Sequence, residues 1–223
     1  MPSFLPYTIA GEQVILTAER TLFWEEQRTL VIADLHVGKT GHFRKSGINI
    51  PQSVYKDDLH RLLAQLLFFN AKTLIIAGDL THSSVNKEMD LFRKWRDDFP
   101  DLDVHLARGN HDVLNTAWYE KAGIVVHNEP FAVGPFLFVH DIMQTALASG
   151  NEQYIFSGHV HPAVTMRGRA KQSLRFPCFY FGKQYCILPA FSRFTGGYRV
   201  VPRPGDDVFA MAGQEILPFR NLE

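Results

Sequence analysis

Three short apolar segments in the first half of the chain constrain its fold most strongly, because each has the length of a buried strand. The segments Thr29–Ala33 (TLVIA), Thr73–Ala77 (TLIIA) and Val104–Ala107 (VHLA) are separated by helix-like stretches over 53–70 and 86–99. Apolar runs of this length that alternate with helices are typical of a parallel sheet covered on both faces. The first half of the chain therefore predicts a β-α-β arrangement.

Short β-favouring segments dominate the rest of the chain, before residue 25 and after residue 123. We expect a loop over Gly38–Pro51, which holds three glycines and a proline, and a short helix over Leu114–Lys121. The second half is expected to form a β-rich meander. The sequence contains no internal repeat and no linker. We therefore predict one α/β domain over residues 1–223, with two packed mixed β-sheets flanked by helices.

The composition excludes several classes of protein. The 223 residues carry 23 basic and 23 acidic side chains, so a basic surface for nucleic acid would have to be local. Cys178 and Cys186 are too few for a disulfide scaffold and fit a reducing compartment. No apolar run reaches the roughly 18 residues of a membrane span, and residues 1–12 lack the pattern of a signal peptide. We therefore expect a soluble cytoplasmic protein with no membrane partner.

Five apolar strand segments are each followed directly by side chains that commonly bind metals. The carboxyl ends of parallel strands meet at one edge of a sheet, where sites form. The spacings D-x-H and H-x-H put two ligands on one side of an extended backbone, and a preceding glycine lets the chain turn without a Cβ atom. The candidate metal ligands are Asp34, His36, Asp79, Asn110, His140, His159 and His161.

Seven ligands of this kind suit two metal ions that share a carboxylate and a water molecule. A mixture of imidazole and carboxylate ligands favours Mn, Fe or Zn over Mg, and we expect two divalent ions, with Mn favoured. Each motif alone is weak, since D-x-H or G-H-x-H is common by chance. All five in this order, each after an apolar strand, make a strong signal.

The five motifs resemble those of the calcineurin-like metallophosphoesterase superfamily, which are D-x-H, G-D, G-N-H-[DE], H and G-H-x-H. The matching segments are Asp34–His36, Gly78–Asp79, Gly109–Asp112, His140 and Gly158–His161. The resemblance implies a four-layer αββα sandwich.

It also implies the ligands of each metal. One ion would be held by Asp34, His36, Asp79 and His161, and the second by Asp79, Asn110, His140 and His159. Asp79 would bridge the two ions, and His111 would be the catalytic histidine beside the leaving oxygen.

Two longer segments narrow the resemblance. Ala33–Pro51 (ADLHVGKTGHFRKSGINIP) and Leu188–Gly197 (LPAFSRFTGG) are similar to a bacterial subgroup, the DNA-ligase-associated metallophosphoesterases, which are described as DNA damage response endonucleases. This likeness implies a role in DNA repair and a DNA ligase or helicase as partner. Many phosphatases of the superfamily pair the catalytic histidine with an aspartate where this chain has His82. Asp112 or a backbone group would then orient His111.

The expected chemistry is hydrolysis of a phosphoester. Two cations lower the pKa of a shared water and clamp the phosphoryl oxygens, and the resulting hydroxide attacks phosphorus in line. Asn110 and His111 would oppose the developing negative charge, with His111 protonating the leaving oxygen. Phe191 and Phe194 are candidates for aromatic contact with the substrate. The candidate substrate-binding residues are Lys39, His42, Arg44, Lys45, His82 and Arg193.

Three functions remain open on the sequence alone. The first is a Mn-dependent nuclease or phosphodiesterase that acts on DNA. The second is a small-molecule phosphatase or nucleotide phosphodiesterase, which the neutral net charge mildly favours. The third is a protein-binding scaffold without activity, although such scaffolds normally lose a ligand. An open groove with residues 39–45 on its wall would favour a polymeric substrate, and a closed pocket would favour a small ester.

Overall fold

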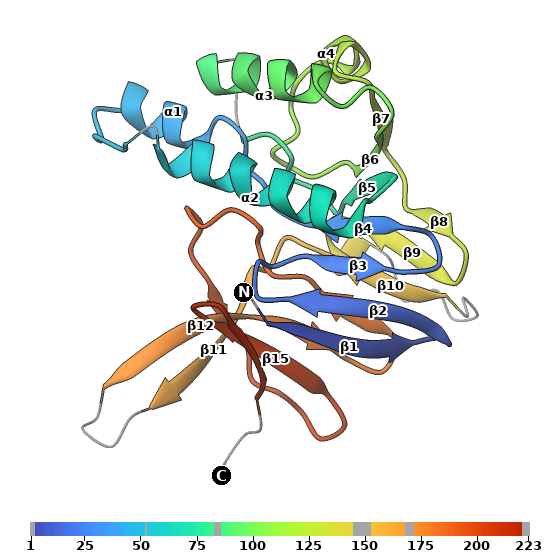
Figure 1. Ribbon diagram of the computed structural model, residues 1–223. Helices are drawn as coiled ribbons and strands as arrows, with labels where there is room; N and C mark the ends of the chain where they lie inside the picture. The colour runs from blue at the N-terminus through green and yellow to red at the C-terminus, as the bar shows by residue number, and fades with distance from the viewer. Residues whose placement is uncertain (1–2, 52, 83–85, 145–152, 168–171, 220–223) are drawn as a thin grey trace.

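Two mixed β-sheets pack face to face in the computed structural model, which describes residues 3–51, 53–82, 86–144, 153–167 and 172–219 (Figure 1). One sheet has seven strands and comes from the first half of the chain, and the other has nine strands and comes from the second half. The expected α/β fold with two packed mixed sheets flanked by helices is confirmed.

The first sheet follows the order of the sequence, β1-β2-β3-β4-β5-β6-β7. Its first four strands pair antiparallel, and β4 to β7 pair parallel. The three apolar segments of the sequence are its central strands β4, β5 and β6. The strands are β1 (Phe4–Ile9), β2 (Glu12–Thr17), β3 (Leu22–Trp24), β4 (Thr29–Ile32), β5 (Thr73–Ile76), β6 (Asp103–Ala107) and β7 (Ile124–His127).

The second sheet has the order β14-β11-β12-β13-β10-β9-β8, with β15 on β12 and β16 on β15. The expected meander is wrong, because β10 pairs parallel with both β9 and β13. This parallel pairing brings the carboxyl ends of β9 and β10 to one edge. The strands are β8 (Phe131–Val133), β9 (Phe136–Val139), β10 (Tyr154–Ser157), β11 (Pro162–Arg167), β12 (Ser173–Phe181), β13 (Tyr185–Ile187), β14 (Tyr198–Arg199), β15 (Asp207–Ala212) and β16 (Glu215–Pro218).

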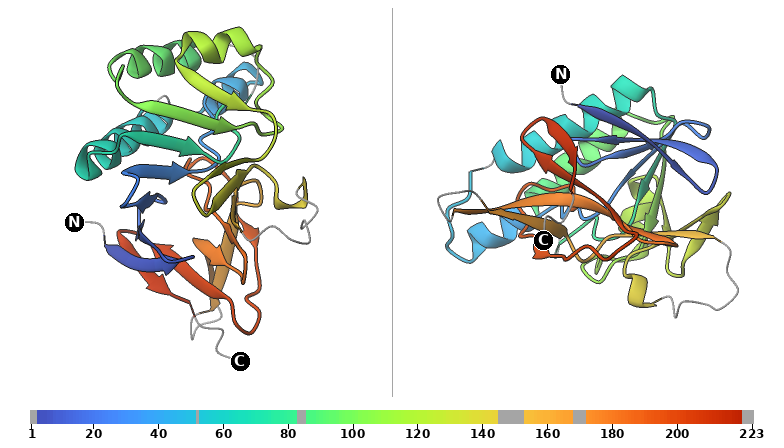
Figure 2. Two further views of the ribbon diagram at one scale, coloured as in Figure 1. Left: turned by 90° about the vertical axis from the view of Figure 1, so that its right-hand side faces the viewer. Right: turned by 90° about the horizontal axis from the view of Figure 1, so that it is seen from below.

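Four α-helices lie together on one side of the molecule, over the outer face of the first sheet (Figures 1 and 2). The outer face of the second sheet carries a short 3-10 helix, η1 (Ile142–Gln144). None of the helices in the described ranges is long and apolar enough to cross a membrane. The α-helices are α1 (Lys39–Lys45), α2 (Ser53–Phe69), α3 (Lys87–Asp97) and α4 (Thr116–Lys121).

Helix α1 corrects the expectation of a loop over Gly38–Pro51. Gly38 stands before the helix with a φ of 91°, a conformation that glycine adopts without strain. The buried face of α1 consists of Thr40, whose hydroxyl donates to Glu88 Oε1, and Gly41, which packs closely on Asn86. Because these residues are small and polar, the face leaves no apolar periodicity in the sequence, and the three glycines suggested a loop.

Strand β4 is apolar after its first residue, Thr29, because both of its faces are buried. In β4, Leu30 and Ile32 face the helices, and Val31 faces the second sheet, as does Ala33 just beyond the strand. Successive side chains of a strand point to opposite faces, so a strand between helices and a second sheet needs apolar residues throughout. The strand ends then carry the first polar residues of each segment, at the edge where the sheet meets solvent.

Candidate metal centre

The structure brings the seven candidate ligands together from five loops that follow β4, β5, β6, β9 and β10. Backbone hydrogen bonds join the first two loops, from Asp34 N–H to Gly78 O and from His36 N–H to Asp79 O (3.0 and 2.9 Å). Six of the seven side chains form two groups in which the ligand atoms lie within 4.8 Å of one another. The groups are Asp34, His36 and His161, and Asp79, His140 and His159.

The first group is buried on one side and open on the other. Asp34 is fully buried, and its carboxylate accepts a hydrogen bond from the backbone N–H of His159 (3.1 Å). His161 Nε2 lies 3.5 Å from Asp34 Oδ1 and 3.4 Å from His36 Nε2. His161 Nδ1 lies 3.2 Å from Gly196 O. A carbonyl oxygen only accepts, so Nδ1 carries the proton and the lone pair of Nε2 points into the site.

In the second group, too, a backbone carbonyl fixes the orientation of a histidine ring. His140 Nδ1 lies 3.3 Å from Ala77 O, so its proton is on Nδ1 and Nε2 is left as a ligand atom. His140 Nε2 lies 3.5 Å from Asp79 Oδ2, 3.0 Å from His159 Nδ1 and 2.9 Å from Asn110 Oδ1. Asn110 therefore presents its side-chain oxygen to this group as a fourth candidate ligand atom.

The backbone at these ligands is left-handed, not extended as the D-x-H and H-x-H spacings suggested. Asp34, His36, Asp79, His159 and His161 all have φ between 51° and 68°. Left-handed backbone is uncommon for residues with a Cβ atom and costs free energy. The ligand side chains therefore enter the centre from tight turns that follow each strand.

Glycines make room for the ligands, as expected. A Cβ atom at Gly78 would lie 1.9 Å from His140 Nδ1, and one at Gly109 would lie 2.2 Å from Asp79 Oδ1. At Gly158 it would lie 2.6 Å from Ala77 O. All three distances are far below van der Waals contact, so no other residue fits without displacing a ligand or a strand end.

The charges in this centre fit bound cations. Asp34 and Asp79 are both almost fully buried, and no lysine or arginine of the described residues forms an ion pair with either. Burial raises the pKa of Asp79, which His140 opposes, and burial lowers the pKa of His36. Buried carboxylates are costly without positive partners, and neutral imidazoles offer lone pairs. Divalent cations would satisfy both.

A family model described as calcineurin-like phosphoesterase matches residues 27–142, slightly more than half of the chain. The chain belongs to the calcineurin-like phosphoesterase family. Its structure resembles a nuclease MPE from Pseudomonas putida, with a TM-score of 0.81 and 29% identity over 97% of this chain and 100% of that one.

More distant structures share less with this phosphoesterase. The phosphoesterase Yfce from E. coli has 13% identity and a TM-score of 0.44, over 83% of this chain and 88% of that one. An archaeal phosphodiesterase has 13% identity and a TM-score of 0.43, over 86% and 98% of the two chains. No protein of curated function matches the sequence.

Asp112 lies beneath the centre of the phosphoesterase and joins two of its loops. It is buried, and its Oδ1 accepts hydrogen bonds from the backbone N–H and the hydroxyl of Thr81 (2.8 and 3.0 Å). Its Oδ2 accepts from the backbone N–H of Gly109 (2.9 Å). The carboxylate thus ties the loop after β5 to the loop after β6, which makes Asp112 a positioning residue in this structure.

His111 stands beside the two groups, among other histidines. Its backbone N–H donates to Asp79 Oδ1 (2.9 Å), and its ring stacks on His82 at 4.6 Å between centroids. His82 also meets the ring of His36 edge-on at 5.2 Å and that of His42 at 5.8 Å. Burial and the charge of Lys39 lower the pKa of His82 to about 4, so His82 is neutral at pH 7. The neutral imidazole of His82, at the position where many phosphatases of the superfamily have an aspartate, stacks on the His111 ring.

The candidate substrate-binding residues divide into two sets. Lys39 and His42 share one face of α1 beside the centre, where burial lowers the pKa of Lys39 and Asp34 opposes this shift. Arg44 faces the other way and pairs with Glu88 at 2.6 Å, and Lys45 lies near it on the surface. Arg193 pairs with Glu19 at 3.0 Å. The structure thus leaves Arg44 and Arg193 engaged with carboxylates of the protein.

The segment Leu188–Gly197 is anchored beside the centre by arginines that the sequence did not single out. Phe191 is fully buried and carries the guanidinium of Arg61 at 4.1 Å over its ring, so the expectation that it contacts substrate is wrong. Arg20 donates to the carbonyls of Ala190 and Ser192 (both 3.0 Å). These arginines lie far away in sequence and outside any motif, so only the fold relates them to the centre.

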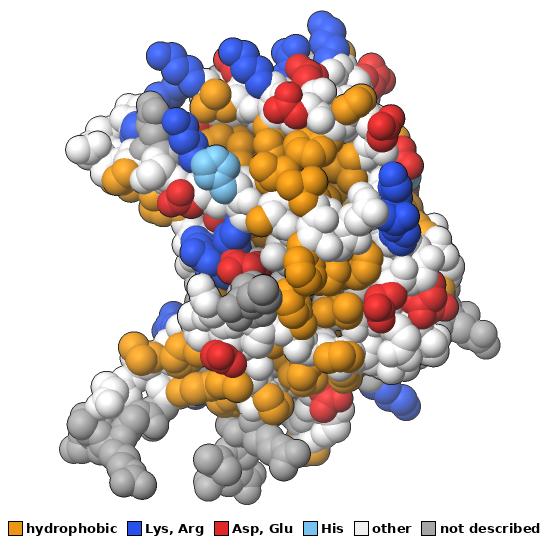
Figure 3. Space-filling model, viewed as in Figure 1, with side chains coloured by type: hydrophobic (Ala, Val, Ile, Leu, Met, Phe, Trp, Pro, Cys, Tyr) orange, Lys and Arg blue, Asp and Glu red, His pale blue; other side chains and the backbone are white. Residues whose placement is uncertain are grey.

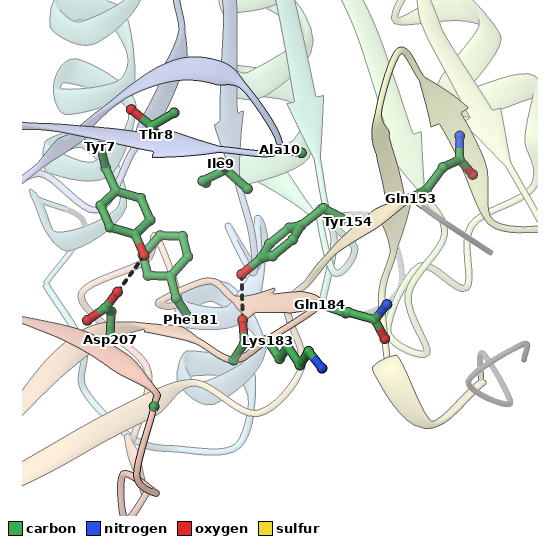
Figure 4. A pocket seen from close by; sticks show the side chains of 12 residues that line it. Tyr7, Thr8, Ile9, Ala10, Gln153, Tyr154, Phe181, Lys183, Gln184 and Asp207 are labelled. Atoms are coloured by element: carbon green, nitrogen blue, oxygen red, sulfur yellow. Dashed lines mark hydrogen bonds between the residues drawn. The ribbon is translucent and has the colours of Figure 1, made fainter. Parts of the chain in front are cut away.

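A second cavity, of about 440 Å³, lies away from the centre (Figure 4). The Tyr7 hydroxyl donates to Asp207 Oδ2 at 2.7 Å, and the Tyr154 hydroxyl donates to Tyr185 O at 2.6 Å. Both hydroxyls are thus engaged within the protein, and none of the seven candidate ligands lines the cavity. This cavity is therefore separate from the candidate metal centre.

Proposed function

We propose that this protein is a nuclease that hydrolyses phosphodiester bonds of DNA with two divalent ions, with Mn favoured. The observation that carries the proposal is the pair of ligand groups at the carboxyl edge of the sheets. The likeness of this chain to a nuclease, over 97% of this chain and 100% of that one, supports a nucleic-acid substrate. Asp34, His36 and His161 would hold one ion, Asp79, Asn110, His140 and His159 the other, and Asp79 would bridge them.

A basic groove beside the centre supports a polymeric substrate. The groove has a volume of about 750 Å³ and runs between α1, the start of α2 and α3. Figure 3 shows lysines and arginines gathered along the edge of the molecule where α1 and α3 lie. No ion pair involves a lysine within the described ranges, so the four lysines of the groove are available to phosphates. They are Lys45, Lys56, Lys87 and Lys94.

Helix α1 lies between this groove and the metal centre. Lys39 and His42, three residues apart, lie on the face toward the centre, whereas Arg44 and Lys45 lie on the groove. The helix has seven residues and is therefore only about 10 Å long. An open basic groove with α1 on its wall is what a polymer requires, and a small ester would not use it.

The side chains of this phosphoesterase have separate tasks in the proposed reaction. When bound, two cations lower the pKa of a water molecule and polarise the phosphoryl oxygens. Asn110 points its oxygen at His140, so its amide N–H groups are free to donate to a phosphoryl oxygen. His111 lies beside the centre and would donate a proton to the leaving oxygen. The stacked, neutral His82 keeps the His111 ring in place.

The cellular setting is proposed from the subgroup likeness. We place the protein in the cytoplasm and in DNA repair, with a DNA ligase or helicase as partner. Affinity purification of the tagged protein from its own cells, before and after DNA damage, tests this partnership.

A panel of substrates tests the function. The purified protein with Mn is incubated with single-stranded DNA, duplex DNA, bis(p-nitrophenyl) phosphate and p-nitrophenyl phosphate, and the products are measured over time. We expect cleavage of DNA and of the diester. The matched variant Asp79→Asn, which removes the proposed bridging charge but keeps the side-chain shape, should be inactive on both.

Two outcomes contradict the proposal. Preference for the monoester would indicate a small-molecule phosphatase. Inactivity on every ester, in protein shown by elemental analysis to hold two metal ions per chain, would indicate a scaffold.

A further inference from the structure

A small pocket adjoins the metal centre on the side of His161. It has a volume of about 210 Å³ and is lined by Arg20 and Arg175 together with small or apolar residues such as Ala163 and Gly197. No carboxylate lines it. A pocket with two cations and no anion of its own is built for an anionic ligand.

The ring of His161 forms the wall between this pocket and the metal centre. Its Nε2 lies 3.5 Å from Asp34 Oδ1 in the centre, whereas its Nδ1 lies 3.2 Å from the carbonyl of Gly196 in the pocket wall. A polymer with one phosphate at the metal centre would therefore extend past His161 into the adjoining pocket.

Arg20 is fixed at the base of the pocket. Its backbone has a φ of 66°, an uncommon conformation for a residue with a Cβ atom. Its Nη1 donates to the carbonyls of Ala190 and Ser192, both at 3.0 Å. These bonds involve only Nη1, and Arg20 lines the pocket. A planar donor group held in this way is pre-organised to bind a phosphate through two parallel hydrogen bonds.

Arg20 makes no ion pair among the described residues, although Asp58 and Glu19 lie near enough to attract its charge. The nearby carboxylates are taken, because Arg61 pairs with Asp58 (2.6 Å) and Arg193 pairs with Glu19 (3.0 Å). Among the described residues, no carboxylate lies within ion-pair distance of the Arg20 guanidinium. Burial and repulsion by Arg61 lower the pKa of Arg20 to about 10. A largely buried guanidinium without a counter-ion is unusual in a protein, and a bound anion would stabilise it.

Arg175 approaches the pocket from the second sheet. It lies on β12 opposite Thr165 of β11, and its Nη1 makes only a long hydrogen bond to Gly197 O (3.5 Å). The side chain is exposed and no ion pair of the described residues involves it. The Arg175 side chain can therefore contact a ligand that Arg20 also binds.

We propose that the Arg20–Arg175 pocket binds the phosphate that flanks the scissile diester in a polynucleotide. The inference rests on the proposed function and deepens it, because it makes the enzyme recognise two successive phosphates. A diester without a neighbouring phosphate would bind to the metal centre alone. The pocket thus distinguishes a nucleic-acid strand from a simple diester.

Three thymidine dinucleotides with one internal diester test the pocket. One has no terminal phosphate, and the others carry a single phosphate at the 5′ or the 3′ end. We expect one of the phosphorylated forms to be cleaved with a kcat/KM at least about tenfold higher than the form without a terminal phosphate, as expected for one added charged hydrogen-bonding group. Arg175→Ala should abolish this preference and leave hydrolysis of bis(p-nitrophenyl) phosphate unchanged. Arg203→Ala, which removes an equal charge outside the pocket, should retain the preference.

Binding of the same dinucleotides to the metal-free protein, measured by calorimetry, separates this inference from the proposed function. Wild-type protein that binds all three equally, or an Arg175→Ala variant that keeps the preference, overturns the pocket. A wild-type protein that is inactive on every diester overturns the proposed function, and the binding preference then still decides whether the pocket takes a phosphate.

Discussion

His111 is the side chain whose removal separates chemistry from metal binding. It stacks on His82 and lies outside both ligand groups, so His111→Ala should keep two metal ions per chain. Loss of a proton donor to the leaving oxygen should lower kcat on DNA by about 10²–10⁴-fold. Elemental analysis and initial rates measure the two quantities. His60→Ala, which removes an exposed histidine of α2, is the matched control. Full activity of the His111 variant would exclude the proposed role.

Asp112 is expected to act through the loops that it joins. Asp112→Ala would leave the backbone N–H groups of Thr81 and Gly109 without their acceptor, whereas the Thr81 hydroxyl keeps the Tyr119 hydroxyl as a partner. Each unsatisfied buried donor costs about 1–3 kcal/mol, so the loss of acceptors for two donors should lower the unfolding free energy by about 2–6 kcal/mol. Denaturant titration measures this loss. The exposed Asp101→Ala should change stability by less than about 0.5 kcal/mol, and an equally small change in Asp112→Ala would contradict the structural role.

The residues of the candidate centre could be predicted where chemistry repeats in the sequence. Each ligand follows an apolar strand, and the motif order is specific, so all seven side chains converge as expected. Arg20 and Arg175 carry no such signal, because they meet only through the pairing of strands and loops distant in sequence. The prediction for Phe191 was wrong because an aromatic residue near an arginine suggests an exposed stacking surface. In the structure, the loop turns Phe191 into the core.

At the scale of elements, the turns that follow the strands determine the geometry of the centre. Gly78→Ala would place a methyl group 1.9 Å from His140 Nδ1 and should displace that ligand. We expect the variant to lose at least one metal ion per chain and most of its activity. Gly11→Ala is the matched control, because Gly11 has a similar φ of 86° and nothing within 4 Å of the added Cβ. If both variants hold two ions, the proposed crowding of His140 is wrong.

The lysines of the groove should affect DNA and not small esters. Lys87→Ala with Lys94→Ala removes two charges from the groove without touching the metal centre. The plot of log affinity against log salt for single-stranded DNA, measured with metal-free protein, should become less steep by about 1.4. Hydrolysis of bis(p-nitrophenyl) phosphate should be unchanged. The pair Lys121→Ala and Lys183→Ala lies outside the groove and should leave the salt dependence as it is. An unaltered slope in the groove variant would refute a role in DNA binding.

Elements with apolar periodicity were predictable, and those without it were not. Strands β4, β5 and β6 and helices α2 and α3 bury continuous or periodic apolar residues, so their positions agree with the expected ones. Helix α1 was not predicted, because its buried face consists of Thr40 and Gly41, which give no apolar periodicity. Its shape matters for function, since it separates the centre from the groove.

At the scale of the whole molecule, the two sheets explain why residues from both halves of the chain meet. The first sheet supplies Asp34, His36, Asp79 and Asn110, and the second sheet supplies the remaining three histidines. Two sheets were predictable from the change in pattern along the sequence. Their strand order was not, because apolar strands in a mixed sheet carry no mark of their neighbours, and a meander satisfies the same alternation.

The zero net charge also has its explanation at this scale. Acidic and basic side chains balance over the chain, but lysines gather at the groove, and arginines gather around the segment Leu188–Gly197. Local fields of this kind attract phosphates without a net positive charge. The total charge is therefore a poor guide to the substrate of this protein.

The central claim is that two cations bind between side chains supplied by both sheets. Anomalous diffraction from crystals grown with Mn measures it directly. The account predicts two anomalous peaks, one among Asp34, His36 and His161 and the other among Asp79, His140 and His159, with Asp79 within bonding distance of both. Well-ordered crystals that show no peak between these side chains, or peaks only elsewhere on the molecule, would contradict it.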